Sequence, residues 1–192
     1  MADSFLGITT DPLGLRNNNP GDFRVGIAWQ GMIGAENGFI TFQDVTWGLR
    51  ALALDLINNI NKGNDTITTF ITQYAPPSEN DTVGYIASVS SDTGLDPNTQ
   101  LGTDNDTIHS MMRAIINKEI GVNYSPQISD TDIDTGIGMA GGEVPTLGSA
   151  ISIALQNPGI YIQSLSILQW TLIVATAGSL ASLLYYLRHN KG

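Results

Sequence analysis

The chain has 192 residues, a formal net charge of −10, only 8 Lys and Arg residues and no cysteine. Such an acidic chain lacks the basic surface that neutralises phosphates, so we expect no nucleic-acid partner. The absence of cysteine excludes disulfides and thiolate metal sites. The length allows one domain with a sizeable core plus an appendage. The first residues lack the basic region and apolar run of a signal peptide, so no export through the secretory channel is expected.

The first part of the chain predicts an arm, a polar turn and a β-hairpin. Residues 1–15 are broken by glycine and proline and predict an irregular N-terminal arm. The run 16–21, Arg-Asn-Asn-Asn-Pro-Gly, favours tight turns. Short strands are expected at residues 23–29 and 38–42, and Asn37-Gly38 is a strong hairpin-turn signal.

Helical periodicity dominates from residue 44 to residue 140. Helices are predicted from Asp44 to Gly63, from Asp65 to Pro76, from Asn80 or Asp81 to Gly94, and from Asp106 to Gly121, with a further short helix at 130–140. The positions expected to face the core in the first three are Val45, Leu49, Leu52, Leu56 and Ile60; Ile67, Phe70, Ile71 and Tyr74; and Val83, Ile86 and Val89.

The helix from Asp106 to Gly121 carries the candidate acid. Ile108, Met111, Met112, Ile115 and Ile116 form its apolar face. Glu119 falls on the same face, since a helix turns about 100° per residue. Desolvation and the negative end of the helix dipole would raise the pKa of this carboxyl group. A carboxylic acid that stays protonated near neutral pH suits the general acid of glycoside cleavage. The alternative is that the last turn frays and Glu119 reaches water.

The C-terminal part predicts a membrane anchor. No Asp, Glu, Lys or Arg occurs from Val144 to Leu187. Residues 165–188 are long enough, at 1.5 Å per residue, to cross a bilayer core of roughly 30 Å. Trp170 and the pair Tyr185-Tyr186 lie near its two ends, where aromatic rings favour the interface. We therefore predict a transmembrane helix at 165–188, joined by a Gly-rich linker with an interfacial helix at 141–164.

The polar turn and the hairpin belong to an ordered series of motifs. The series is Arg16-Asn17-Asn18-Asn19-Pro20-Gly21, Trp29-Gln30-Gly31, Gly38-Phe39-Ile40-Thr41-Phe42, Gly48-Leu49-Arg50-Ala51, Thr66-Ile67, Ala75-Pro76-Pro77-Ser78-Glu79-Asn80-Asp81-Thr82, Tyr85-Ile86 and Ala114-Ile115-Ile116 with Glu119. Over about residues 15–140 this series resembles a family of bacteriophage virion proteins that includes structural proteins and lytic transglycosylases. The hairpin and the helices after it are also similar to part of the muramidases of the lysozyme-like superfamily.

This resemblance implies a lysozyme-like domain over residues 16–140, mainly α with one hairpin. In those enzymes the catalytic Glu ends a helix that precedes the Asn-rich turn, whereas here the similar helix end comes after the other helices. We therefore predict a circularly permuted domain in which Glu119 is the catalytic acid. The implied reaction cleaves the β-1,4 bond of peptidoglycan glycan strands. The resemblance assigns substrate contacts to Asn17, Asn18 and Asn19, to stacking by Trp29 or Tyr85, and to Gln30.

Other ionisable residues offer weaker sites. Glu36 and Glu79 are the candidates for a second carboxylate, although Glu79 also fits a helix cap. The spacing Asp130-x-Asp132-x-Asp134 lacks the Gly and Glu that a calcium loop needs. With His109 and His189 as the only histidines, a zinc site has too few ligands. We expect neither a metal nor another cofactor.

Two functions follow from these patterns. The first is a peptidoglycan-cleaving enzyme of a phage virion, anchored in the virion membrane and, during assembly, in the host cytoplasmic membrane. The second is a non-catalytic structural membrane protein of the virion that links the capsid and the membrane. Both predict a lipid membrane and capsid or other virion proteins as partners.

Overall fold

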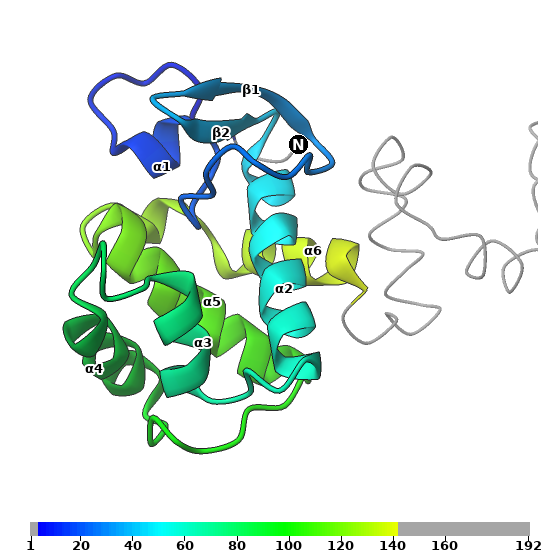
Figure 1. Cartoon of the computed structure of the whole chain (residues 1–192). Coiled ribbons are helices and arrows are strands. Elements are labelled where there is room, and N and C mark those ends of the chain that lie inside the picture. The colour runs from blue at the N-terminus through cyan, green and yellow to red at the C-terminus, as the bar shows by residue number, and fades with distance from the viewer. Residues whose placement is uncertain (1–3, 142–192) are drawn as a thin grey trace, which may run out of the picture. The chain divides into compact units, whose positions relative to one another are not determined.

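We describe residues 4–141 of a computed structural model. They form a mainly α unit with one antiparallel hairpin, as predicted. The elements are α1 (Leu13–Arg16), β1 (Met32–Glu36), β2 (Phe39–Phe42), α2 (Val45–Asn61), α3 (Ile67–Tyr74), α4 (Thr82–Thr93), α5 (Asn105–Ile120), the 3-10 turn η1 (Ser125–Gln127) and α6 (Asp130–Ala140). Figure 1 shows α1 and the hairpin together at one end of this unit. Among residues 4–141 no helix is long and apolar enough to cross a membrane; the transmembrane helix expected at 165–188 lies outside the described residues.

Local capping signals set the helix boundaries. The Asp44 carboxylate accepts a hydrogen bond from the Thr46 amide at 3.1 Å and begins α2, and Asp81 begins α4 in the same way. The short helix predicted at 130–140 is present as α6. Two predicted starts are wrong by one or two residues. The N-cap of α3 is Thr66 rather than Asp65, and that of α5 is Asp104, which leaves Asp106 in the first turn.

The core forms where α2 and α5 meet the other helices. The predicted inner positions of α2 and the apolar face of α5 are all buried. The prediction for α4 is partly wrong. Val83 is 79% exposed, and Tyr85 with Val89 fills the buried side instead. Val83 lies in the first turn of α4, where helical periodicity alone does not determine which side meets the core.

The hairpin forms where its turn predicts, but with a different first strand. Glu36 pairs with Phe39 across Asn37 and Gly38, whose φ values of 52° and 83° are those of a two-residue type I′ turn. The predicted strand at 23–29 is wrong, because β1 is formed by residues 32–36. Of the earlier segment, Arg24 makes only an isolated bridge to Phe39.

The asparagine run joins α1 to the hairpin. The Asn19 amide group donates to the carbonyls of Phe23 and Ile40 at 2.9 and 3.0 Å, and its oxygen accepts from the Phe23 amide at 3.0 Å. Asn18 donates to the Phe42 carbonyl at 3.1 Å and accepts from the Phe5 amide at 2.9 Å. Both side chains are fully buried. We call residues 17–19 the asparagine joint. The side chains of Asn18 and Asn19 complete the backbone bonding of the hairpin, and the Asn17 carbonyl accepts from the Phe42 amide at 2.9 Å.

Substitution of Asn19 by Ala is expected to lower the free energy of unfolding by about 3 kcal/mol, because it leaves buried backbone groups unbonded. Urea denaturation of the variant and of Asn123→Ala, where the native side chain is exposed, measures this. Equal midpoints for the two variants would contradict a structural role of the joint.

Candidate active site

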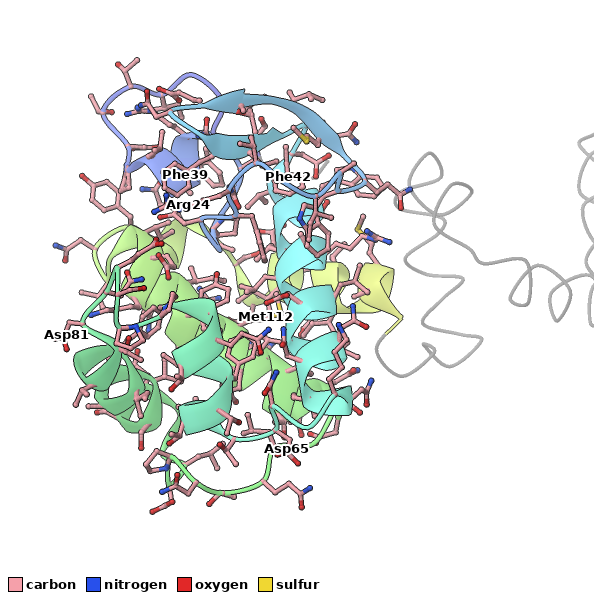
Figure 2. The ribbon with its side chains drawn as sticks, viewed as in Figure 1. Arg24, Phe39, Phe42, Asp65, Asp81 and Met112 are labelled. Atoms are coloured by element: carbon pink, nitrogen blue, oxygen red, sulfur yellow. The ribbon has the colours of Figure 1, made fainter. Side chains whose placement is uncertain are left out.

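A cleft of about 460 Å³ separates the hairpin side of the unit from its helices. On the hairpin side it is lined by Gly21, Asp22, Phe23, Arg24 and Phe39, and on the helical side by Asp55, Asn59, Gln73, Tyr74, Ala75, Pro76, Glu79, Asn80 and Glu119. Figure 2 shows Arg24 beside Phe39, and the Arg24 guanidinium carbon lies 5.2 Å from the centre of that ring. The cleft thus combines several carboxyl groups with amides and aromatic rings.

Glu119 lies in the last turn of α5 and is half-buried in this cleft. Helix α5 continues through Ile120, so the last turn is not frayed at this residue. The Tyr85 hydroxyl donates a hydrogen bond of 2.6 Å to Glu119 Oε1. Burial raises the pKa of the Glu119 carboxyl, while the bond from Tyr85, the charge of Lys118 and a hydrogen bond with Asp22 oppose the rise. The arrangement suits a carboxyl group that exchanges a proton with a bound molecule.

Asp22 faces Glu119 and was not predicted from the sequence. Burial, followed by the charge of Glu119 and a hydrogen bond with it, raises the pKa of Asp22 to about 7. Its Oδ1 atom is buried without a hydrogen-bond partner. The backbone of Asp22 has a positive φ of 48°, and its amide donates to the Asn19 carbonyl at 2.9 Å. The signal in the sequence was an acid directly after the Asn-Pro-Gly turn, but that position alone predicts an exposed loop residue.

Tyr74 connects the two sides of the cleft. Its hydroxyl donates to the carbonyl of Gly21, immediately before Asp22. Its ring stacks on Phe70 at 5.4 Å and meets Tyr85 edge-on at 6.4 Å. Tyr74 therefore links the loop that carries Asp22 to the tyrosine that holds Glu119.

A second polar group lies on α2 within the cleft. Burial raises the pKa of Asp55, and Asn59 donates to its carboxylate at 3.2 Å. Asn59 also accepts from Asn64, whose amide group bonds to Gln73. This row of amides was not predicted as part of a site, because each residue alone is an ordinary polar position of a helix or loop.

None of the residues predicted to bind substrate is among those that line the cleft. The joint residues Asn18 and Asn19 are buried and bonded to backbone, and Asn17 is buried with its oxygen accepting from Thr41 at 3.2 Å. Trp29 packs on Phe23 with ring centres 5.3 Å apart, outside the residues that line the cleft. Gln30 is exposed. Tyr85 is buried and bonds to Glu119.

The two candidates for a second carboxylate also differ. Glu36 accepts two hydrogen bonds from Arg16, at 2.7 and 3.2 Å, which lower the pKa of Glu36, and it does not line the cleft. Glu79 lines the cleft, 3.7 Å from Arg24 at the exposed rim. It does not cap α4, because Asp81 does.

The other ionisable cluster lies between α5 and α6. His109 contacts Asp134 at 2.8 Å and Asp130 at 3.3 Å, and Arg113 bonds to Asp130 at 2.6 Å. Asp132 forms the capping box of α6 with Ser129. Within residues 4–141 no group of three or more His, Asp or Glu side chains is arranged to hold a metal ion.

Asp22→Asn is expected to stabilise the protein as pH rises. The ordinary pKa of Asp is 3.8 and the folded value is about 7, so between these values the folded state holds a proton that the unfolded chain releases, and wild-type stability falls with increasing pH. The variant lacks this loss, so its free energy of unfolding relative to that of wild type should rise by about 3 kcal/mol between pH 4 and pH 7. Urea denaturation across this range measures the difference, with Asp106→Asn as an exposed control; parallel curves for wild type and Asp22→Asn would contradict the shift.

Comparison with known proteins identifies the family. No family model matches the chain. Protein P5 of Pseudoalteromonas phage PM2 is 34% identical to it over 117 residues, which cover 57% of this chain and 72% of that protein. The match covers most of the length of Protein P5 and is much longer than any single sequence motif. The chain therefore belongs to the family of bacteriophage proteins that includes Protein P5 of phage PM2.

Proposed function

We propose that this phage-family protein cleaves the glycan strands of peptidoglycan, as a lytic transglycosylase or muramidase, with Glu119 as the general acid. The observation that supports this most is the position of Glu119, a carboxyl group with a raised pKa in the cleft, held by Tyr85. A protonated carboxyl at this position is the group that glycosidic-bond cleavage requires.

The proposed reaction has two proton transfers at one residue. Glu119 gives its proton to the bridging oxygen as the C1–O bond breaks. The resulting carboxylate then removes the proton from the 6-hydroxyl of the muramic residue, whose oxygen bonds to C1 and closes a 1,6-anhydro ring. In a muramidase, water takes the place of that hydroxyl. The transglycosylase path needs no second carboxylate as a nucleophile. Of the two candidates predicted from the sequence, Glu36 does not line the cleft and Glu79 lies at its exposed rim.

The residues that line the cleft suit a sugar chain better than the residues that the sequence predicted as substrate contacts. Asp55, Asn59 and Gln73 present carboxylate and amide groups that bond hydroxyl and acetamido groups. Phe23 and Phe39 add aromatic side chains to the opposite side. We assign Asn17, Asn18 and Asn19 to the support of the site and Tyr85 to the orientation of Glu119, and we retain Trp29 and Gln30 as outer contacts.

The order of the elements is consistent with a permuted lysozyme-like domain. The short helix α1 directly precedes the asparagine joint, at the place where the catalytic helix of the resembling enzymes lies. Helix α5 contacts α1. The C-terminal end of α5 carries Glu119. In the resembling enzymes the helix before the asparagine-rich turn carries the catalytic carboxyl group. In this proposal α5, which comes later in the chain, supplies that group instead.

Membership of a phage family supports a virion location. We propose that the domain is held on the virion membrane by the segment 165–188, next to capsid or other virion proteins, and opens the cell wall during entry. Glycan cleavage distinguishes this function from that of a purely structural link between capsid and membrane.

The direct test is digestion of purified peptidoglycan by the full chain in detergent. Glu119→Gln keeps the size of the side chain and removes the acid, so release of soluble fragments should fall at least about 100-fold. Glu36→Gln is the matched control and should stay close to wild type. Mass spectrometry separates anhydro products from hydrolysed ends. No release by wild type, or full release by Glu119→Gln, would refute the assignment and favour the structural role.

Tyr85→Phe should separate orientation of Glu119 from stacking on a sugar. Loss of the hydroxyl removes a bond that lowers the pKa of Glu119, so the alkaline limb of kcat/KM should move to higher pH while kcat falls about 10-fold. The pH dependence of peptidoglycan cleavage measures both. A stacking residue would tolerate Phe, and an unchanged pH profile and rate would therefore rule out the orienting role.

A further inference from the structure

We propose that Asp22 is a positioning residue that keeps its own proton and donates a hydrogen bond to the Glu119 carboxylate formed during the reaction. This inference rests on the proposed function and adds a second carboxyl group to its site. It differs from both Glu36 and Glu79, because Asp22 is in contact with Glu119 itself.

Asp22 is held in place from three directions. Its amide donates to the Asn19 carbonyl, and the carbonyl just before it accepts from Tyr74. Gly14 of α1 packs so closely against the side chain that a Cβ atom on Gly14 would lie 2.4 Å from Asp22 Oδ1. That oxygen is buried and without a partner. Because Oδ1 is enclosed, the carboxyl group of Asp22 forms its hydrogen bond with Glu119.

Ionisation of both Asp22 and Glu119 at the same time is energetically unfavourable. Two contacting carboxylates repel, so one of them retains a proton, and burial favours the neutral form of each. Some of the groups around Asp22 and Glu119 lower the pKa values of the pair, and others stay neutral or add negative charge. The charge of Arg24 lowers the pKa of Asp22, and Lys118 lowers that of Glu119, whereas the phenols of Tyr74 and Tyr85 stay neutral because burial raises the pKa of each. Asp55 adds negative charge beside Tyr74.

The proton balance of the step is complete without any other reactant. Glu119 transfers its proton to the bridging oxygen and becomes a carboxylate. Tyr85 and the protonated Asp22 each donate a hydrogen bond to it, and neither gives up its proton. When Glu119 takes the proton of the attacking hydroxyl, both return to the initial state. The form active in cleavage therefore carries protons on both Asp22 and Glu119.

The kinetic test compares wild type, Asp22→Asn and Asp22→Ala on peptidoglycan, using the full chain. Asn donates a hydrogen bond and does not titrate, so it should keep activity within about threefold, whereas Ala should lose about 10- to 100-fold. As pH rises, the wild-type kcat/KM should decline with the loss of two protons, one from Glu119 and one from Asp22, whose pKa is about 7, and that of Asp22→Asn with the loss of one. A two-proton decline in Asp22→Asn, or full activity of Asp22→Ala, would overturn the inference. Asp106→Asn serves as the control for an exposed acid.

A titration followed by carboxyl-carbon NMR separates this inference from the proposed function. The Asp22 midpoint should fall in Glu119→Gln, because the charge of Glu119 contributes to its position; an unchanged midpoint would overturn the coupling. If wild type cleaves and the NMR titration shows that Asp22 is coupled to Glu119, but the Asp22 variants keep wild-type kinetics, then the proposed role of Asp22 is refuted and the proposed function stands. Wild type that cleaves nothing refutes the proposed function, and the catalytic role of Asp22 with it.

Discussion

The hydrogen bonds of the asparagine joint are the constraint on which the site depends. They attach the hairpin to α1 and complete the bonding of buried backbone groups at Phe23, Ile40 and Phe42. Asp22 lies between the joint and the first of these residues, so its position is set by bonds that belong to the fold. The asparagine run therefore supports the fold, and in our proposal the chemistry belongs to the neighbouring Asp22 and to Glu119.

The same constraint explains the electrostatics of the cleft. A carboxyl group on a free loop would turn toward water and away from Glu119, but the backbone of Asp22 is held on both sides by Asn19 and Tyr74. Desolvation then acts on both acids at once. Tyr85, fixed in the core of the helices, supplies the hydrogen bond that orients one of them.

Local signals predicted the helices between residues 44 and 140. The features that the sequence did not show depend on contacts between residues far apart in the chain. Asp44 and Asp81 cap their helices through neighbours two or three residues away, so such starts are readable. The place of Glu119 on the face of α5 that carries the apolar residues could be predicted, because helical periodicity is a local property. Asp22 and Asp55 were missed because their burial depends on α1, α3 and α5, far away in sequence. The first strand was misplaced because the Gly-rich stretch between residues 26 and 34 carries no period that sets its register.

The central claim is that Glu119 contacts a glycosidic oxygen in this cleft. A crystal structure of Glu119→Gln with a tetrasaccharide of alternating N-acetylglucosamine and N-acetylmuramic acid tests it most directly. We predict a sugar chain between Phe39 and Asp55, with a bridging oxygen within hydrogen-bonding distance of the residue 119 side chain. A glycan bound away from residue 119, or an empty cleft at saturating glycan, would contradict the account.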